Sequence, residues 1–258
     1  MKNKLFSVMF ALPVTAGICG ALLRSWQIRY AYDAETGILQ SGNLITYGLV
    51  AVCVIAALMA VIAAFLLKRG LPLPADKTGS ISSAALSVAA VVVLAYAGMI
   101  FWSLREGFSG VQLVLALFSV YCSVALLVMG KYRMQERDST AYCVFSAVPV
   151  FWACFMLILT FREKIADPII ANYVPLILSY ISILFFCYSI AAHVLGKNKK
   201  HVAVFSCFIG VFFMLLELIS FFASNGAVGM SLEKVREMLP LVAFLVLMPA
   251  TCAEIVRK

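Results

Sequence analysis

The sequence predicts an all-α integral membrane protein, a polytopic bundle of eight transmembrane helices with both termini in the cytoplasm. Three observations carry this prediction. Hydrophobic residues make up 64% of the 258-residue chain and charged residues only 12%, whereas soluble domains are roughly half apolar and a quarter charged. The apolar residues gather into runs of about 20, the length that a bilayer crossing needs. The basic residues lie between these runs and are divided unevenly between the two sides.

Eight apolar runs are long enough to cross a bilayer. The bilayer core offers no water to the backbone, so each run is expected to form a helix, and the alternation typical of a membrane barrel is absent. In chain order the runs cover about 5–24, 43–67, 83–104, 110–130, 140–161, 168–195, 202–223 and 238–255. The last is the weakest because Leu239–Ile255 is short and contains Pro240 and Pro249. The alternative is seven spans, with this segment lying in the interface.

The first run is expected to be an uncleaved helix. Lys2 and Lys4 precede it, as in a signal peptide, but the run is longer than a usual signal core and no small-x-small cleavage site precedes Arg24. The segment after it, 25–43, is the longest outer loop, and its first half can continue the helix. Gly37 and Gly42 are expected to end that continuation.

The distribution of basic residues predicts the orientation. With the N-terminus inside, most of the 20 Lys and Arg fall in cytoplasmic segments, as the positive-inside rule requires. The residues left outside are Arg24, Arg29, Arg105, Arg162, Lys164, Lys234 and Arg236. The net charge of +8 is therefore explained by orientation, and it does not indicate nucleic-acid binding.

Short loops leave no room for a soluble domain, so residues 1–258 are predicted to form one transmembrane domain. Residues 231–240 are expected to form a short amphipathic helix on the outer surface, or an ordinary connection. Short matches such as 11–14 with 147–150 give a weak signal of a four-plus-four duplication, about 1–135 and 136–258. Chance and shared helix-end chemistry are the alternative.

Glu217 is the most unusual residue of the sequence, because it lies inside the apolar run FFMLLELISFF. It is about 15 residues from the cytoplasmic start of its helix, roughly 22 Å into the membrane. A carboxylate there costs a few kcal/mol unless it is protonated, paired or hydrated. Arg24 is the natural partner at similar depth. The predicted polar cluster at the outer side comprises Glu217, Arg24, Asn172, Tyr173 and Tyr180.

Three interpretations of this cluster stay open. It is a structural ion pair between helices, a site for a ligand, ion or proton, or a glutamate that reaches for the outer interface. The sequence carries no zinc-protease, nucleophile-elbow, Walker A or dinucleotide motif, so it predicts no metal, cofactor or nucleotide. The eight cysteines all fall in the apolar runs without a C-x-x-C pair and are expected to be packing residues.

These features favour a small transporter-like protein or membrane-complex subunit over an enzyme. The alternatives are an anchor or regulator of a partner protein and an intramembrane enzyme acting on a lipid-type substrate. The enzyme would need at least two titratable groups opening to one membrane face. The expected partners are the lipid bilayer and either another membrane protein or a second copy of the chain. The expected location is a plasma membrane, and short loops with unpaired cysteines fit the bacterial cytoplasmic membrane.

Overall fold

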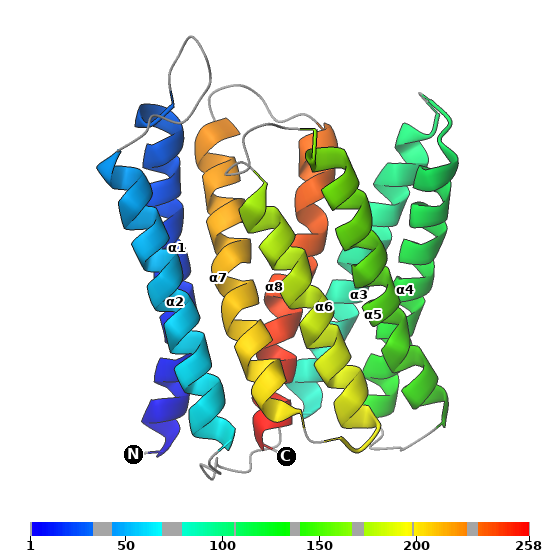
Figure 1. Ribbon diagram of the computed structural model, residues 1–258. Helices are drawn as coiled ribbons and strands as arrows, with labels where there is room; N and C mark the ends of the chain where they lie inside the picture. The colour runs from blue at the N-terminus through cyan, green and yellow to red at the C-terminus, as the bar shows by residue number, and fades with distance from the viewer. Residues whose placement is uncertain are drawn as a thin grey trace.

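The computed structural model describes residues 2–32, 43–68, 79–105, 107–134, 140–166, 173–197, 199–225 and 232–257. Within these ranges the chain forms eight α-helices, which confirms the all-α prediction (Figure 1). They are α1 (Lys2–Tyr30), α2 (Leu44–Lys68), α3 (Gly79–Ser103), α4 (Gly110–Met134), α5 (Thr140–Lys164), α6 (Val174–Val194), α7 (Lys200–Asn225) and α8 (Leu232–Arg257).

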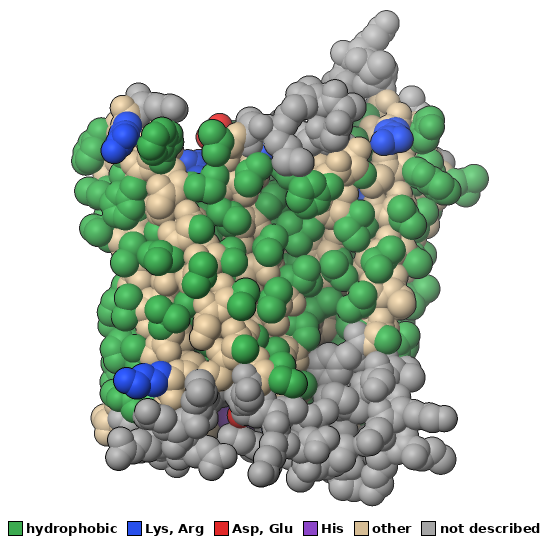
Figure 2. Space-filling model, turned by 180° about the vertical axis from the view of Figure 1, so that it is seen from behind, with side chains coloured by type: hydrophobic (Ala, Val, Ile, Leu, Met, Phe, Trp, Pro, Cys, Tyr) green, Lys and Arg blue, Asp and Glu red, His purple; other side chains and the backbone are tan. Residues whose placement is uncertain are grey.

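Seven helices of the described chain, α2 to α8, are long and apolar enough to cross a membrane. The last run, the weakest in the sequence, is one of them, since α8 continues through Pro240 and Pro249 for 26 residues. The helix that is not among the seven is α1. Figure 2 shows one face of the bundle, on which the coloured Lys and Arg side chains lie near the helix ends and uncharged side chains cover the band between.

The two helices that extend furthest beyond the apolar runs that predict them are α1 and α8. As expected, α1 continues past Arg24 to Tyr30. The expected short surface helix at 231–240 is not separate, because Leu232–Leu239 form the first two turns of α8. The predicted apolar run, 238–255, begins six residues after the start of α8 because charged residues fill the first two turns of this helix. Arg236 and Glu237 therefore belong to the same continuous helix as the last apolar run.

Helices α3 to α8 form a ring. Each packs on the next in chain order, and α8 packs back on α3, while α1 and α2 lie outside the ring against α7 (Figure 1). Both chain termini lie at one end of the bundle, which we call the terminal end, and the opposite end is the distal end. Whether the terminal end is cytoplasmic, and whether the halves are duplicates, stay predictions.

The centre of the ring is filled by a stacked aromatic pair. The rings of Trp152 on α5 and Phe244 on α8 are 5.7 Å apart and nearly parallel, and both side chains are fully buried. The indole nitrogen of Trp152 donates a hydrogen bond of 2.9 Å to the Ser119 hydroxyl on α4. The pair therefore ties three helices together at one level and occupies the space between them.

Small residues let α1 approach α7 closely. A side chain on Gly17 would place its Cβ 3.0 Å from the Cβ of Leu215 and 3.3 Å from the Phe212 carbonyl oxygen. Those two atoms belong to a helix backbone and its first side-chain carbon, so they cannot rotate away. Contact between α1 and the ring therefore depends on glycine at this position.

We expect Gly17→Ala to lower the free energy of unfolding by about 1 kcal/mol or more, because the added methyl group overpacks the α1–α7 contact. The measurement is thermal unfolding of the purified protein in detergent. Gly98→Ala is the matched control, since a Cβ at Gly98 on α3 meets nothing within 4 Å. Equal melting temperatures for the two variants would contradict the expected role of Gly17.

Candidate functional site

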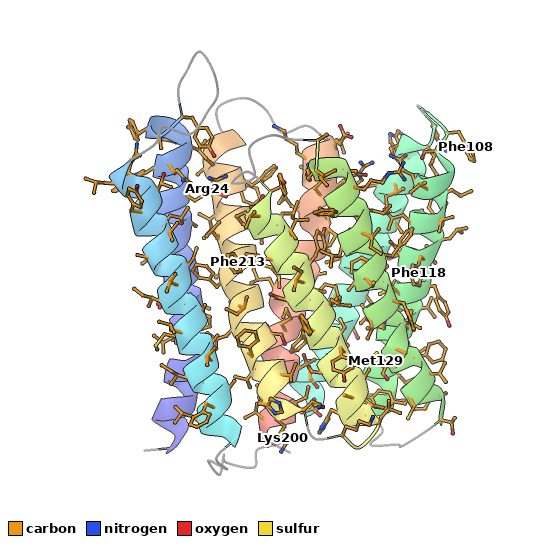
Figure 3. The ribbon with its side chains drawn as sticks, viewed as in Figure 1. Arg24, Phe108, Phe118, Met129, Lys200 and Phe213 are labelled. Carbon is orange, nitrogen blue, oxygen red and sulfur yellow. The ribbon has the colours of Figure 1, made fainter. Side chains whose placement is uncertain are left out.

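The predicted site residues lie on three helices near the distal end. Arg24 is on α1, Glu217 on α7 and Tyr180 on α6, and Tyr173 is the N-cap residue of α6. Asn172 lies outside the described residues. Figure 3 shows Arg24 near the distal end of the bundle, with Lys200 at the opposite end.

Arg24 belongs to a polar cluster between α1 and α2. Its guanidinium donates hydrogen bonds to the Gln27 side-chain oxygen at 2.5 Å and to the Tyr32 hydroxyl at 3.3 Å, and the Arg24 side chain is buried. The Gln27 amide in turn donates to the Thr46 hydroxyl on α2 at 3.0 Å. The Gln27–Thr46 bond joins α1 to α2. Arg24, which was predicted to pair with Glu217, donates to Gln27 and Tyr32.

Glu217 forms no side-chain hydrogen bond or ion pair with any residue that the structure describes. No hydrogen bond or ion pair joins Glu217 to Arg24 in the described chain, where Arg24 donates to Gln27, one helical turn away on α1. The charges of Arg24, Lys164 and Glu237 still act on the Glu217 carboxylate through space. Whether Glu217 is structural or functional stays a prediction.

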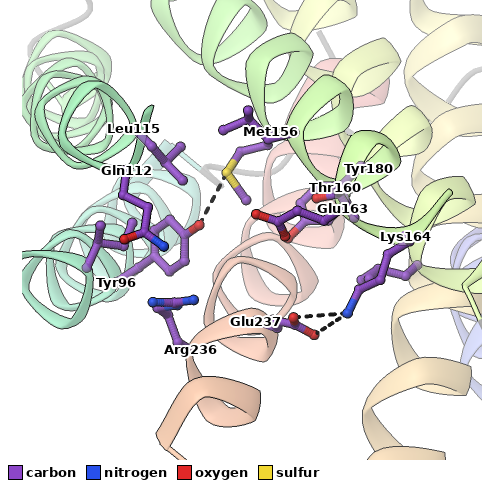
Figure 4. Close-up of a pocket in the computed structure, with 13 residues that line it drawn as sticks. Tyr96, Gln112, Leu115, Met156, Thr160, Glu163, Lys164, Tyr180, Arg236 and Glu237 are labelled. Atoms are coloured by element: carbon purple, nitrogen blue, oxygen red, sulfur yellow. Dashed lines mark hydrogen bonds and ion pairs between the residues drawn. The ribbon is translucent and has the colours of Figure 1, made fainter. Parts of the chain in front are cut away.

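A different group of polar side chains lines a pocket at the distal mouth of the ring (Figure 4). Its walls come from α3, α4, α5, α6 and α8, and the cavity has a volume of about 50 Å³, with further space open to the outside. We call it the distal pocket. Of the predicted residues that the structure describes, only Tyr180 lines it. Its polar members are Tyr96, Gln112, Thr160, Glu163, Lys164, Tyr180, Arg236 and Glu237.

One ion pair crosses the wall of the distal pocket from α5 to α8. The Lys164 ammonium donates to both carboxylate oxygens of Glu237, at 3.0 and 3.2 Å. Each of these side chains is 32% exposed, so the pair is partly shielded from solvent. Figure 4 shows this pair on the opposite side of the pocket from Tyr96.

The other two charges of the pocket are differently placed. Arg236 donates to the Ser103 hydroxyl at 3.1 Å, and its guanidinium lies 3.6 Å from Glu233, whose side chain is 77% exposed. Glu163 forms no hydrogen bond or ion pair with a described residue. The pocket thus holds one satisfied ion pair together with a tethered arginine and an open carboxylate.

Two buried tyrosines complete the inner part of the pocket. Tyr96 is 5% exposed and donates to the Met156 sulfur at 3.4 Å, and a thioether is a weak acceptor. Tyr180 is 2% exposed, and its hydroxyl has no hydrogen-bond partner among the described residues. A buried polar group without a partner costs about 1–3 kcal/mol, so such a group in a pocket wall points to a ligand that supplies the missing bond.

The distal pocket was not predicted from the sequence because its charges lie at the ends of the apolar runs. Lys164 and Arg236 served only to predict the orientation of the chain in the membrane, and no role was predicted for Glu163 or Glu237. The available signal was two adjacent acid–base pairs, Glu163–Lys164 and Arg236–Glu237, each at a helix end on the same side of the membrane. Sequence spacing alone could not show that α5 and α8 face each other.

A second buried acid was also missed. Glu254 on α8 is 3% exposed and accepts a hydrogen bond from the Ser82 hydroxyl on α3, near the terminal end. The signal was its position inside the last apolar run. Within the described chain no group of three or more His, Cys, Asp and Glu side chains could hold a metal ion, and the eight cysteines are free thiols.

We expect Tyr180→Phe to leave the free energy of unfolding unchanged or to raise it by up to about 1 kcal/mol, because the substitution removes a buried hydroxyl that lacks a partner. Trp152→Phe is the contrasting variant, because it loses the bond to Ser119 and leaves a void, and it should destabilise the bundle. Thermal unfolding in detergent measures both. A clear loss of stability in Tyr180→Phe would show that its hydroxyl is already bonded in the protein.

We expect Lys164→Met to destabilise the bundle more than Arg162→Met, because only Lys164 leaves a carboxylate, that of Glu237, without its cation. Combined with Glu237→Gln in a double-mutant cycle, it should give a coupling energy of about 1 kcal/mol, as expected for a partly exposed pair. The measurement is thermal or denaturant unfolding at low salt. A coupling energy near zero would show that the pair contributes nothing to stability.

Comparison with known proteins assigns neither a family nor a function to this chain. The chain matches no protein-family model, no curated protein and no solved structure. The fold and the distal pocket therefore have to be interpreted from the residues of this chain.

Proposed function

We propose that this membrane-embedded helical bundle binds a small polar solute in the distal pocket, as a transport-type protein. The observation that carries the proposal is the buried Tyr180 hydroxyl, which lines a pocket inside the helix ring and has no partner among the described residues. Ligand sites typically combine apolar walls with a few polar groups that fix orientation. Leu115, Leu176 and Met156 supply the apolar part here.

The arrangement of the ring supports transport in particular. The distal pocket is open toward one end of the bundle, and the Trp152–Phe244 stack fills the ring beneath it. A transporter that exposes its site to one side at a time needs such a closed layer on the other side. In this proposal α1 is the eighth span, both termini are cytoplasmic, and the pocket opens to the outside of a bacterial plasma membrane.

In this proposal Glu217 lies near the pocket and contributes its charge to the site. Its carboxylate does not line the pocket, but its charge acts on Tyr180, as do those of Glu163 and Glu237. A cationic or protonated centre bound near Tyr180 would therefore be stabilised by Glu217 without direct contact. Arg24, Tyr173 and Asn172 remain proposed members of this outer region.

An enzyme acting on a lipid-type substrate is the second candidate. It requires at least two titratable groups opening to one membrane face, and the distal pocket holds four charged side chains together with Tyr96 and Tyr180. Arg236 also lines a groove on the outer surface of α3 and α8, with Trp102 and Leu232, at the level where lipid headgroups would lie. Chemical change in a bound lipid would favour this candidate over transport.

The proposal is tested by filling the pocket. We expect Thr160→Phe, which places a ring in the distal pocket, to abolish the rise in melting temperature that binding solutes from a metabolite library cause in the wild type. Each solute that binds is then followed for uptake into liposomes containing the protein, and recovered to see whether it is unchanged. Uptake of an intact solute by the wild type but not by Thr160→Phe is the expected result.

Ala64→Phe is the control for this substitution. It adds the same ring in an apolar groove between α2 and α7, away from the distal pocket, and should leave solute binding intact. Binding that survives Thr160→Phe would place the solute site elsewhere. Binding that is lost in Glu217→Gln but kept in Thr160→Phe would return the site to the Glu217 cluster.

A further inference from the structure

We infer that the distal pocket selects a small zwitterion, whose cationic centre binds Glu163 and whose anionic group binds Arg236. The inference rests on the proposed function, since it names the class of solute for the same pocket. It follows from the charges of the pocket wall and from which of them are already satisfied.

The charges that face the pocket balance, but only one pair of them is joined. Lys164 and Glu237 bond directly at 3.0 Å and neutralise each other. The remaining charges are the Glu163 carboxylate and the Arg236 guanidinium, which Figure 4 shows on different sides of the pocket. A ligand that enters the pocket therefore meets one anion and one cation that do not bond to each other.

Arg236 is held in place with hydrogen-bonding capacity to spare. Its bond to Ser103 and its looser approach to the exposed Glu233 orient the guanidinium, which carries five donors. A planar guanidinium fixed in this way is suited to bidentate binding of a carboxylate or phosphate group. Glu163 offers the complementary feature, a carboxylate without a described partner on the α5 side.

A ligand with a single charge would satisfy only one of these groups. The other group would keep only its contact with solvent, since Glu163 is exposed and Arg236 is half-buried. A zwitterion pairs with both groups at once. Tyr96, Tyr180, Gln112 and Thr160 add neutral hydrogen-bonding groups to the wall of the same pocket.

The test uses probes that differ only in charge. The zwitterions are L-alanine and γ-aminobutyrate, whose charged groups are close together and farther apart. The matched cations are their amides, and the matched anions are their N-acetyl derivatives. Binding to the purified full-length protein is measured by thermal shift and by calorimetry. We expect at least one zwitterion to bind and its two single-charge relatives to bind about tenfold more weakly or less, since each lacks one charge-assisted hydrogen bond.

Substitutions of the two pocket charges sharpen the test. Glu163→Gln should weaken zwitterion binding about tenfold and shift the preference toward the N-acetyl anion, and Arg236→Gln should shift it toward the amide cation. Arg162→Gln, next to Glu163 on α5 but outside the pocket wall, should change neither. Arg236→Lys keeps the positive charge and separates a loss of binding from a loss of folding in Arg236→Gln.

The outcomes distinguish this inference from the proposed function. A single-charge probe that binds as tightly as its zwitterion, or the absence of binding by all the probes, overturns the zwitterion inference. Zwitterion binding that is unaffected by both Glu163→Gln and Arg236→Gln also overturns it. Binding of any probe that persists in Thr160→Phe overturns the assignment of the pocket itself.

Discussion

The stack of Trp152 on Phe244 is the contact on which the rest of the ring depends. It lies among α3 to α8, where six apolar helices would otherwise enclose a gap in the middle of the bundle. Packing an indole there removes the gap, and the hydrogen bond to Ser119 satisfies the one polar atom that the indole brings inside. The ring can therefore close around an interior that is filled and fully bonded at this level.

The stack also separates two polar regions. Toward the distal end, Tyr96 and Tyr180 lie among the charges of the distal pocket, and toward the terminal end Ser82 bonds to the buried Glu254. Polar groups within a membrane protein are expensive unless they are bonded or reach water, so they collect near the two ends of the helices. The apolar Trp152–Phe244 layer lies between these two polar regions.

The sequence predicted the helices well because length and hydropathy are local properties. In the described ranges eight helices form, α1 continues past its apolar run, and α8 is a full-length helix. The neighbours of each helix could not be predicted, since a run of Leu, Val and Phe carries little information about which helix it contacts. Lys164 and Glu237 are 73 residues apart and meet only because α5 and α8 contribute to the same ring. Arg24 donates to Gln27, one turn away on the same helix, so this bond could be formed from local geometry alone.

Glu217 shows why an acid can persist in an apolar helix without a direct partner. Its helix, α7, contacts α1, α2, α6 and α8, so it lies between the Arg24 cluster and the distal pocket. Burial and the like charge of Glu237 disfavour the charged Glu217 carboxylate, whereas the charges of Arg24 and Lys164 favour it from a distance, because electrostatic interactions weaken slowly where water is scarce. A direct ion pair with Glu217 would have engaged one of these two cations, Arg24 or Lys164. Arg24 bonds to Gln27 on its own helix, Gln27 joins α1 to α2, and Lys164 joins α5 to α8, while Glu217 lies on α7 between these two groups.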